Sequence, residues 1–297
     1  LPSTVGLTVM GTLASLLVVA YDKLVPSSTL ADQLGTFLAD IDFSTTLMEG
    51  MLSFLLFAGA MHVNWTHMRK GRWPILIFST IGVLLSTAIV GFAFQFLTLA
   101  LGIEIPLIWC LVFGALISPT DPVSVMAVMK RAAMPDTLQA TVAGESLFND
   151  GIGVVVFTIL IAIATGTEAF TWGFAISHFM QEALGGAALG LTVGWIGYLA
   201  MKSIDEYVIE VMISLAVVMG GYSLAMGLHV SGPVAMAVAG LIIGNAGMAN
   251  AMSEVTRDHV VKFWTLIDEV LNAVLFLLIG LEVIALDFRP AYLAAGA

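Results

Sequence analysis

The chain has 297 residues, of which 59% are hydrophobic and only 10% are charged, and its formal net charge is −11. In a soluble domain roughly a quarter of the residues are charged, so this composition excludes water as the main solvent and indicates a membrane protein in contact with the lipid bilayer. The basic residues form no cluster that could follow a phosphate backbone, which excludes nucleic acid as a partner. The single cysteine, Cys110, can form no disulfide within the chain.

Apolar stretches of about 20 residues predict membrane-spanning helices along the whole chain. Helices are expected because lipid cannot satisfy exposed backbone groups, and the alternating segments of a membrane β-barrel are not seen in the sequence. The nine predicted spans are 5–21, 44–63, 74–101, 107–130, 138–164, 174–200, 206–227, 231–248 and 263–286. We interpret residues 1–297 as a single transmembrane domain that is incomplete, a fragment lacking terminal helices, because both ends of the sequence look cut.

The basic residues predict the orientation of these spans, because cytoplasmic loops are enriched in Lys and Arg. If the first span runs outward, only Lys23 and Arg289 of the 10 basic residues fall on the outer side. The others fall at cytoplasmic ends: Arg69, Lys70, Arg72, Lys130, Arg131, Lys202, Arg257 and Lys262. This asymmetry supports both the number and the direction of the predicted spans.

Two prolines, Pro119 and Pro122, lie in the middle of the fourth predicted span. Each proline removes a backbone donor and disfavours helical geometry at the residue before it, so we expect a broken helix at Thr120-Asp121-Pro122. Broken helices expose carbonyl groups and helix ends at the centre of the membrane, where secondary transporters bind ions. Thr120 then offers a carbonyl and a hydroxyl, and Asp121 offers a carboxylate. The alternative is a proline kink in which Asp121 only caps the second half-helix.

Four polar residues occupy the middle of the fifth predicted span: Glu145, Ser146, Asn149 and Asp150. Glu145 and Asn149 are four residues apart, as are Ser146 and Asp150, so on a helix they form two neighbouring ridges on one face. Ionisable groups at this depth are costly in a membrane and usually functional. The pattern predicts a polar site on one helix face, and a purely structural polar network is the alternative.

Together the two segments offer oxygen ligands from Thr120, Asp121, Ser146 and Asp150. Oxygen ligands suit a hard cation and not zinc or copper, which prefer imidazole or thiolate. The histidines lie near helix ends and are interpreted as interfacial or packing residues: His62, His67, His178, His229 and His259. No cofactor is expected beyond the ions that the protein would transport.

These two motifs resemble those of the monovalent cation/proton antiporters, in the sodium/proton exchanger branch that carries an Asn-Asp pair. Thr120-Asp121-Pro122 is followed by Gly144-Glu-Ser-Leu-Phe-Asn-Asp-Gly151 in the order and spacing of that family. Phe263-Trp264 and the segment 272–280 also resemble the family, so the similarity covers nearly the whole chain.

The resemblance implies an inverted-repeat antiporter fold, a homodimer in the cell membrane and a part in pH homeostasis. It implies an ion site at Thr120, Asp121, Ser146 and Asp150, with Glu145 paired to an arginine beyond the end of this chain. Many exchangers also carry an acidic residue before an Ala-Gly pair in the third helix, where this sequence has Phe57. A third carboxylate is therefore not carried over.

The expected mechanism needs one site with two mutually exclusive occupants, because Asp150 can be neutralised by a proton or by a sodium ion. If the site changes sides only when it is neutralised, the two gradients are coupled by alternating access. Asn149 replaces a second aspartate found in a related branch, which predicts electroneutral exchange. The protein is expected not to be an enzyme. The alternatives are an intramembrane aspartyl protease, with two aspartates sharing a proton, and a cation channel.

Overall fold

The structure is a computed structural model, and it describes residues 3–25, 30, 33–34, 36, 50–120, 123–168 and 170–285. The regular elements formed by these residues are all helices, without a strand. Seven of the described helices are long and apolar enough to cross a membrane. The chain is therefore an all-α, multi-pass membrane protein, which confirms the fold class that its composition predicts.

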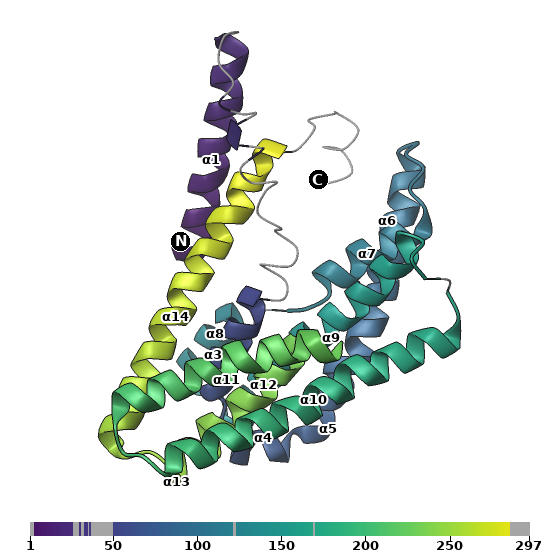
Figure 1. Ribbon diagram of the computed structural model, residues 1–297. Coiled ribbons are helices and arrows are strands. Elements are labelled where there is room, and N and C mark those ends of the chain that lie inside the picture. The colour runs from purple at the N-terminus through teal and green to yellow at the C-terminus, as the bar shows by residue number, and fades with distance from the viewer. Residues whose placement is uncertain are drawn as a thin grey trace.

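The helices are coloured in chain order in Figure 1. They are α1 (Ser3–Leu24), α3 (Leu52–Met61), α4 (Trp65–Lys70), α5 (Arg72–Ile77), the π turn η2 (Phe78–Gly82), α6 (Val83–Ala100), α7 (Leu107–Ile117), α8 (Val123–Arg131), α9 (Asp136–Ala164), α10 (Trp172–Lys202), α11 (Tyr207–Leu228), α12 (Gly232–Ile242), the π turn η3 (Ile243–Gly247), α13 (Met248–Asn250), α14 (Glu254–Leu281) and the 3₁₀ turn η4 (Glu282–Ala285). The elements α5, η2 and α6 run on as one long span, as do α12, η3 and α13.

Two of the nine predicted spans contain helices shorter than a bilayer crossing. The helix α3 has 10 residues, and residues 44–49, which the prediction places before it, lie outside the described part of the chain. The helix α7 has 11 residues because it ends at Ile117, just before the first proline of the Pro119 and Pro122 pair. The helix α8 then begins at Val123. The interruption falls where the two prolines predict it.

Side-chain caps explain why some helices begin earlier than the apolar stretches suggest. The last predicted span starts at residue 263, whereas α14 begins at Glu254. Ser253 accepts a hydrogen bond from the backbone amide of Thr256 through its hydroxyl oxygen, at 3.4 Å, and so caps the helix. The first turns of α14 are polar, and hydropathy alone does not register a polar helix.

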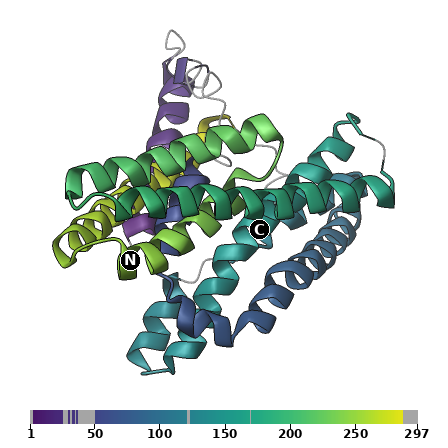
Figure 2. The ribbon, with the colours of Figure 1, turned by 60° about the horizontal axis from the view of Figure 1, so that its bottom comes forward.

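The helix α12 lies at the centre of the packing, between α3, α9, α10 and α11. Small residues let the backbones approach closely. A Cβ atom added at Gly190 of α10 would lie only 2.2 Å from the Ala235 carbonyl oxygen, and one added at Gly240 of α12 only 2.5 Å from the Phe57 carbonyl oxygen. Figure 2 shows α10 lying lengthwise beside α11.

The helices α1 and α14 run side by side along most of their length (Figure 1). Gly11 and Gly280 meet at their crossing, where an added Cβ on Gly11 would lie 2.8 Å from the Leu277 carbonyl oxygen. The Ser15 hydroxyl crosses the same contact and donates to the Gly280 carbonyl at 3.0 Å. This pair is joined to the remaining helices mainly where α14 packs on α3 and α11.

A third group of helices, α6, α7 and α9, carries the interrupted segment. Gly114 of α7 lies against the backbone of α6, because a Cβ atom there would be 2.4 Å from the Thr87 carbonyl oxygen. The helix α9 packs on α7 on one side and on α10 and α12 on the other. It therefore connects the broken helix with the central group of helices, and its polar face belongs to that junction.

Candidate ion-binding site

The helix break between α7 and α8 is supported by hydroxyl groups on its α7 side. Ser118, which follows the last residue of α7, donates its hydroxyl to the Gly114 carbonyl at 2.6 Å. The hydroxyl of Thr87 in α6 donates to the Ser118 hydroxyl oxygen at 3.3 Å. Pro119 and Thr120 then leave helical geometry. Asp121 and Pro122, which the sequence predicts at the centre of the break, lie outside the described residues.

Two side chains of α9 hydrogen-bond to Thr120 across the break. The Ser146 hydroxyl donates to the Thr120 carbonyl at 2.5 Å. The Asn149 amide nitrogen donates to the Thr120 hydroxyl oxygen at 3.0 Å. Both side chains are buried, with exposed fractions of 3% for Ser146 and 1% for Asn149. The polar face of α9 and the broken helix thus form one site, and Thr120, Ser146 and Asn149 meet there as the two motifs predict.

Asn149 also organises the neighbouring carboxylate. Its amide nitrogen donates a second hydrogen bond, of 2.9 Å, to Glu145 Oε1. Both amide hydrogens of Asn149 are therefore used, while its Oδ1 atom is buried and has no hydrogen-bond partner among the described residues. A buried carbonyl oxygen without a partner is costly. It is an acceptor that a cation could satisfy, beside the Thr120 oxygens.

Asp150 is half-buried on α9, next to two glycines that bring other chain segments close to it. A Cβ atom at Gly153 would lie 2.4 Å from the Pro119 ring, and one at Gly151 would lie 2.9 Å from Val234 of α12. Only glycine allows α9 to approach both the break and α12 so closely. The carboxylate of Asp150 is thus held on the helix face between these two contacts.

The ligand set near Thr120 consists of oxygen atoms of several kinds. The described residues contain no group of three His, Cys, Asp or Glu side chains that could hold a metal ion. Carbonyl, hydroxyl and carboxylate oxygens are the ligands of hard cations, which agrees with the prediction from the sequence. Phe57 is fully buried, with its ring centroid 4.6 Å from that of Trp264. Its position in α3 therefore supplies packing and no ligand.

Sequence reasoning missed a second polar junction, made by Asn245 of the π turn η3. Its Oδ1 accepts from the Trp65 amide at 2.8 Å, and its Nδ2 donates to the Val63 carbonyl at 2.9 Å. These bonds close the gap between α3 and α4. A single asparagine near a helix end carries no signal of such a distant partner, although π turns often mark functional positions.

Sequence reasoning also assigned His178 and His229 to packing or to the interface. The structure places both at a cavity on the far side of α9 from the break, where His178 pairs with Glu182. The four-residue spacing of His178 and Glu182 inside an apolar span is a signal for this pair, because residues so spaced share a helix face. The position of His229 beside them depends on the packing of α11.

Comparisons with known proteins agree on one family. A family model described as "Sodium/hydrogen exchanger, transmembrane" matches residues 1–295. The Na(+)/H(+) antiporter NhaP of Pseudomonas aeruginosa is 46% identical over 295 residues, which are 99% of this chain and 69% of the relative. The Na(+)/H(+) antiporter NhaH of Halobacillus dabanensis is 32% identical over 248 residues, which are 82% of this chain and 60% of the relative.

A solved structure has the same fold. The sodium proton antiporter MjNhaP1 from Methanocaldococcus jannaschii at pH 8 superposes with a TM-score of 0.66 and 21% identity, over 94% of this chain and 70% of that one. This chain therefore spans between 60% and 70% of the length of these three proteins. The matched proteins are antiporters, so neither the protease nor the channel alternative is favoured.

Proposed function

Because this chain belongs to the sodium/hydrogen exchanger family, we propose that its protein exchanges sodium, or another monovalent cation, for protons at the helix break beside α9. The family is one of transporters, and the chain is a multi-pass component of the cell membrane, not an enzyme. The proposed ligands are Thr120, Asp121, Ser146 and Asp150. We treat residues 1–297 as one transport domain.

The observation that carries this proposal is the pair of hydrogen bonds from α9 to Thr120. Ser146 and Asn149 hold the carbonyl and the hydroxyl of Thr120 beside the polar face of α9. The oxygens of the break and the carboxylate of Asp150 are thereby brought to one junction. A broken helix supported by a neighbouring helix is the arrangement that secondary transporters use for ions.

The proposed exchange uses Asp150 as the shared carboxylate. A proton or a cation neutralises it, and the two occupants exclude each other. The buried Oδ1 atom of Asn149 has no hydrogen-bond partner among the described residues and adds a further oxygen for the cation. Alternating access follows if the group containing α6, α7 and α9 moves against the group around α12 only when the site is neutral.

Three finer points belong to the same proposal. The exchange is electroneutral, because Asn149 carries no proton and only Asp150 changes state. The protein forms a homodimer in the bilayer and serves pH homeostasis, for which the support is the family resemblance. No cofactor is needed, because the chemistry consists of binding and releasing the two ions.

The test is exchange by the full-length protein in proteoliposomes, followed with a pH-sensitive dye while sodium, lithium or potassium is added. Asp150→Asn should abolish proton release on addition of the cation, because the amide cannot exchange a proton for a cation. Asp136→Asn, which changes an aspartate in the first turn of the same helix, is the matched control and should keep exchange. Normal exchange by Asp150→Asn would remove the central claim.

A further inference from the structure

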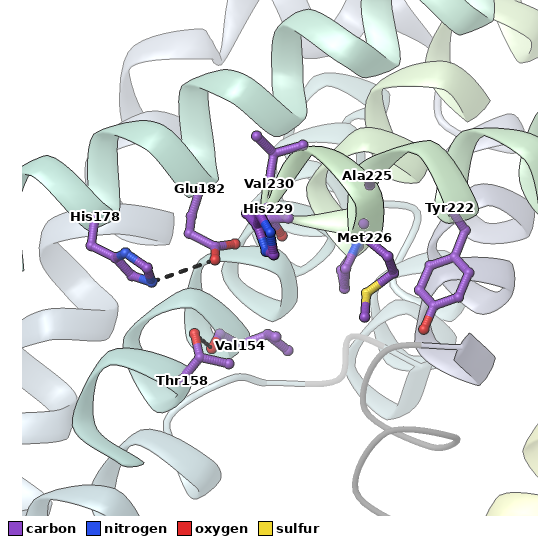
Figure 3. A pocket seen from close by; sticks show the side chains of 12 residues that line it. Val154, Thr158, His178, Glu182, Tyr222, Ala225, Met226, His229 and Val230 are labelled. Carbon is purple, nitrogen blue, oxygen red and sulfur yellow. Dashed lines mark hydrogen bonds and ion pairs between the residues drawn. The ribbon is translucent and has the colours of Figure 1, made fainter. Parts of the chain in front are cut away.

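A second polar cavity lies beside α9, between α10, the end of α11 and the start of α12. Its volume is about 350 Å³. Its polar lining residues are Thr158, His178, Glu182, Tyr222, His229 and Ser231. Figure 3 shows His178 and Glu182 facing each other on α10, with Val154 and Thr158 of α9 below them.

The cavity continues the face of α9 that carries Asp150. Residues four apart share a helix face, and four residues rise about 6 Å along the axis. Val154 and Thr158 therefore lie about 6 and 12 Å beyond Asp150, in the direction of Ala164. That end of α9 is the one that the Lys and Arg pattern predicts on the outer side. The cavity is thus placed between the outer side and the proposed ion site.

Glu182 is built into the wall of this cavity. Its backbone carbonyl accepts a hydrogen bond of 3.2 Å from the Ser231 amide at the start of α12. Its side chain is 19% exposed, and Oε1 lies 3.6 Å from His178 Nε2. One turn further on, a Cβ atom at Gly185 would lie 2.6 Å from Val230, which shows how closely the helices meet here. The carboxylate is therefore held at the cavity and does not swing freely from the surface.

The groups that face Glu182 make its charge sensitive to protons. On α10 the neighbour is His178, and on α11 the titratable groups are Tyr222 and His229. The lining residues from α9 and α12 contribute the hydroxyls of Thr158 and Ser231 but no charge. Glu182 is the acidic residue of this lining, which contains no Lys or Arg. With neutral imidazoles the cavity carries a negative charge, whereas a protonated His178 cancels it.

We infer that Glu182, paired with His178, is a second cation-binding site on the outer side, from which the cation passes along the α9 face to Asp150. The inference rests on the proposed exchange function. The occupant is a monovalent cation, since the described residues offer no three-ligand group for a metal such as zinc. A proton on His178 opposes this loading and a neutral His178 permits it. The site therefore links outer pH to cation uptake without taking part in the exchange at Asp150.

The first test measures the apparent KM for sodium separately from each side, in vesicles of known orientation that contain the full-length protein. Glu182→Gln should raise the outer apparent KM about five- to tenfold, because one attracting charge is lost, and should leave the inner KM and the maximal rate unchanged. Glu168→Gln is the matched control, because Glu168 is exposed near the same ends of α9 and α10 and is not part of the cavity lining. Glu182→Asp keeps the charge and should stay close to the unchanged protein.

The second test uses His178→Gln, which retains a polar side chain but cannot be protonated. Between about pH 8 and pH 6 on the outer side, this variant should lose part of the rise in outer KM that the unchanged protein shows. An unchanged outer KM in Glu182→Gln, or an equal rise on both sides, would overturn the inference. Failure of the unchanged protein to exchange sodium for protons would instead remove the proposed function. The two failures are therefore distinguishable.

Discussion

Asn149 shows how one residue can hold an ion site without titrating in it. Its two amide hydrogens go to the Thr120 hydroxyl and to Glu145 Oε1, and its Oδ1 is left for another partner. An aspartate in the same place could not donate either bond and would place a second negative charge beside Glu145. The amide therefore suits a residue that positions Thr120 and leaves proton exchange to Asp150.

Ser146 is the residue at which cation affinity should be most directly altered. Ser146→Ala removes the hydroxyl that holds the Thr120 carbonyl, a contribution of about 1 kcal/mol for one hydrogen bond. We expect the apparent KM for the cation to rise about fivefold while the protein stays folded, as measured by exchange and by thermal unfolding in detergent. Ser223→Ala is the control, because Ser223 is exposed and donates only to Met219 of its own helix. Unchanged affinity in Ser146→Ala would exclude Ser146 from the ligands.

At the scale of helices, the structure contains two interruptions, and each is bridged by a side chain from another element. The break between α7 and α8 is bridged by Ser146 and Asn149 of α9. The gap between α3 and α4 is bridged by Asn245 of η3. Backbone groups freed from a helix need such partners inside a membrane, since lipid supplies none. Side-chain amides and hydroxyls therefore decide where a helix can be interrupted.

Asn245→Leu should destabilise the junction of α3 and α4. The change leaves the Trp65 amide and the Val63 carbonyl without the partner that they have now, at about 1–3 kcal/mol for each group that stays unsatisfied. We expect a lower Tm of the purified protein in detergent. Asn250→Leu is the matched control, because Asn250 is exposed and donates only to the Ala246 carbonyl of its own helix turn. An equal Tm for the two variants would show that Asn245 does not support the junction.

For the whole molecule, the direction of the chain through the membrane can be tested at two exposed positions. Arg69→Cys should react with a membrane-impermeant thiol reagent only from the cytoplasmic side, and Glu168→Cys only from the outside. These positions suit the test because both are exposed. The neighbouring Gly71 is pressed against Thr141, and Gly166 has a φ of +73° that disfavours a side chain. Labelling of both cysteines from the same side would show an error in the number of spans between them.

The charge moved in one transport cycle is also a property of the whole molecule. If only Asp150 changes state, one cation is exchanged for one proton, and a membrane potential does not drive the cycle. A potential of about 100 mV, worth roughly 2.3 kcal/mol for each net charge moved, should therefore leave the exchange set-point in proteoliposomes unchanged. Asn149→Asp adds a titratable group and should make the set-point depend on voltage. A voltage-dependent set-point in the unchanged protein would contradict one-for-one exchange.

The sequence alone predicts those features that depend on neighbouring residues. Composition indicates the membrane, and two prolines three residues apart predict the end of α7 because a proline acts on its own turn of helix. The period of the α-helix places Ser146 and Asp150 on one face. The family motifs add the connection between Thr120 and that face. None of these inferences requires knowledge of how distant helices pack.

Tertiary packing decided the rest of the site. The partners of Asn149, the link from Asn245 to the α3–α4 gap and the position of His229 at the cavity of Glu182 all join residues from different helices. These contacts depend on how far the helices approach and rotate, which small residues such as Gly190 set by admitting another backbone. Local chemistry therefore determined where this chain is helical, where it breaks and which face is polar, whereas packing determined which polar groups meet, because their distances are set by contacts spread over several helices.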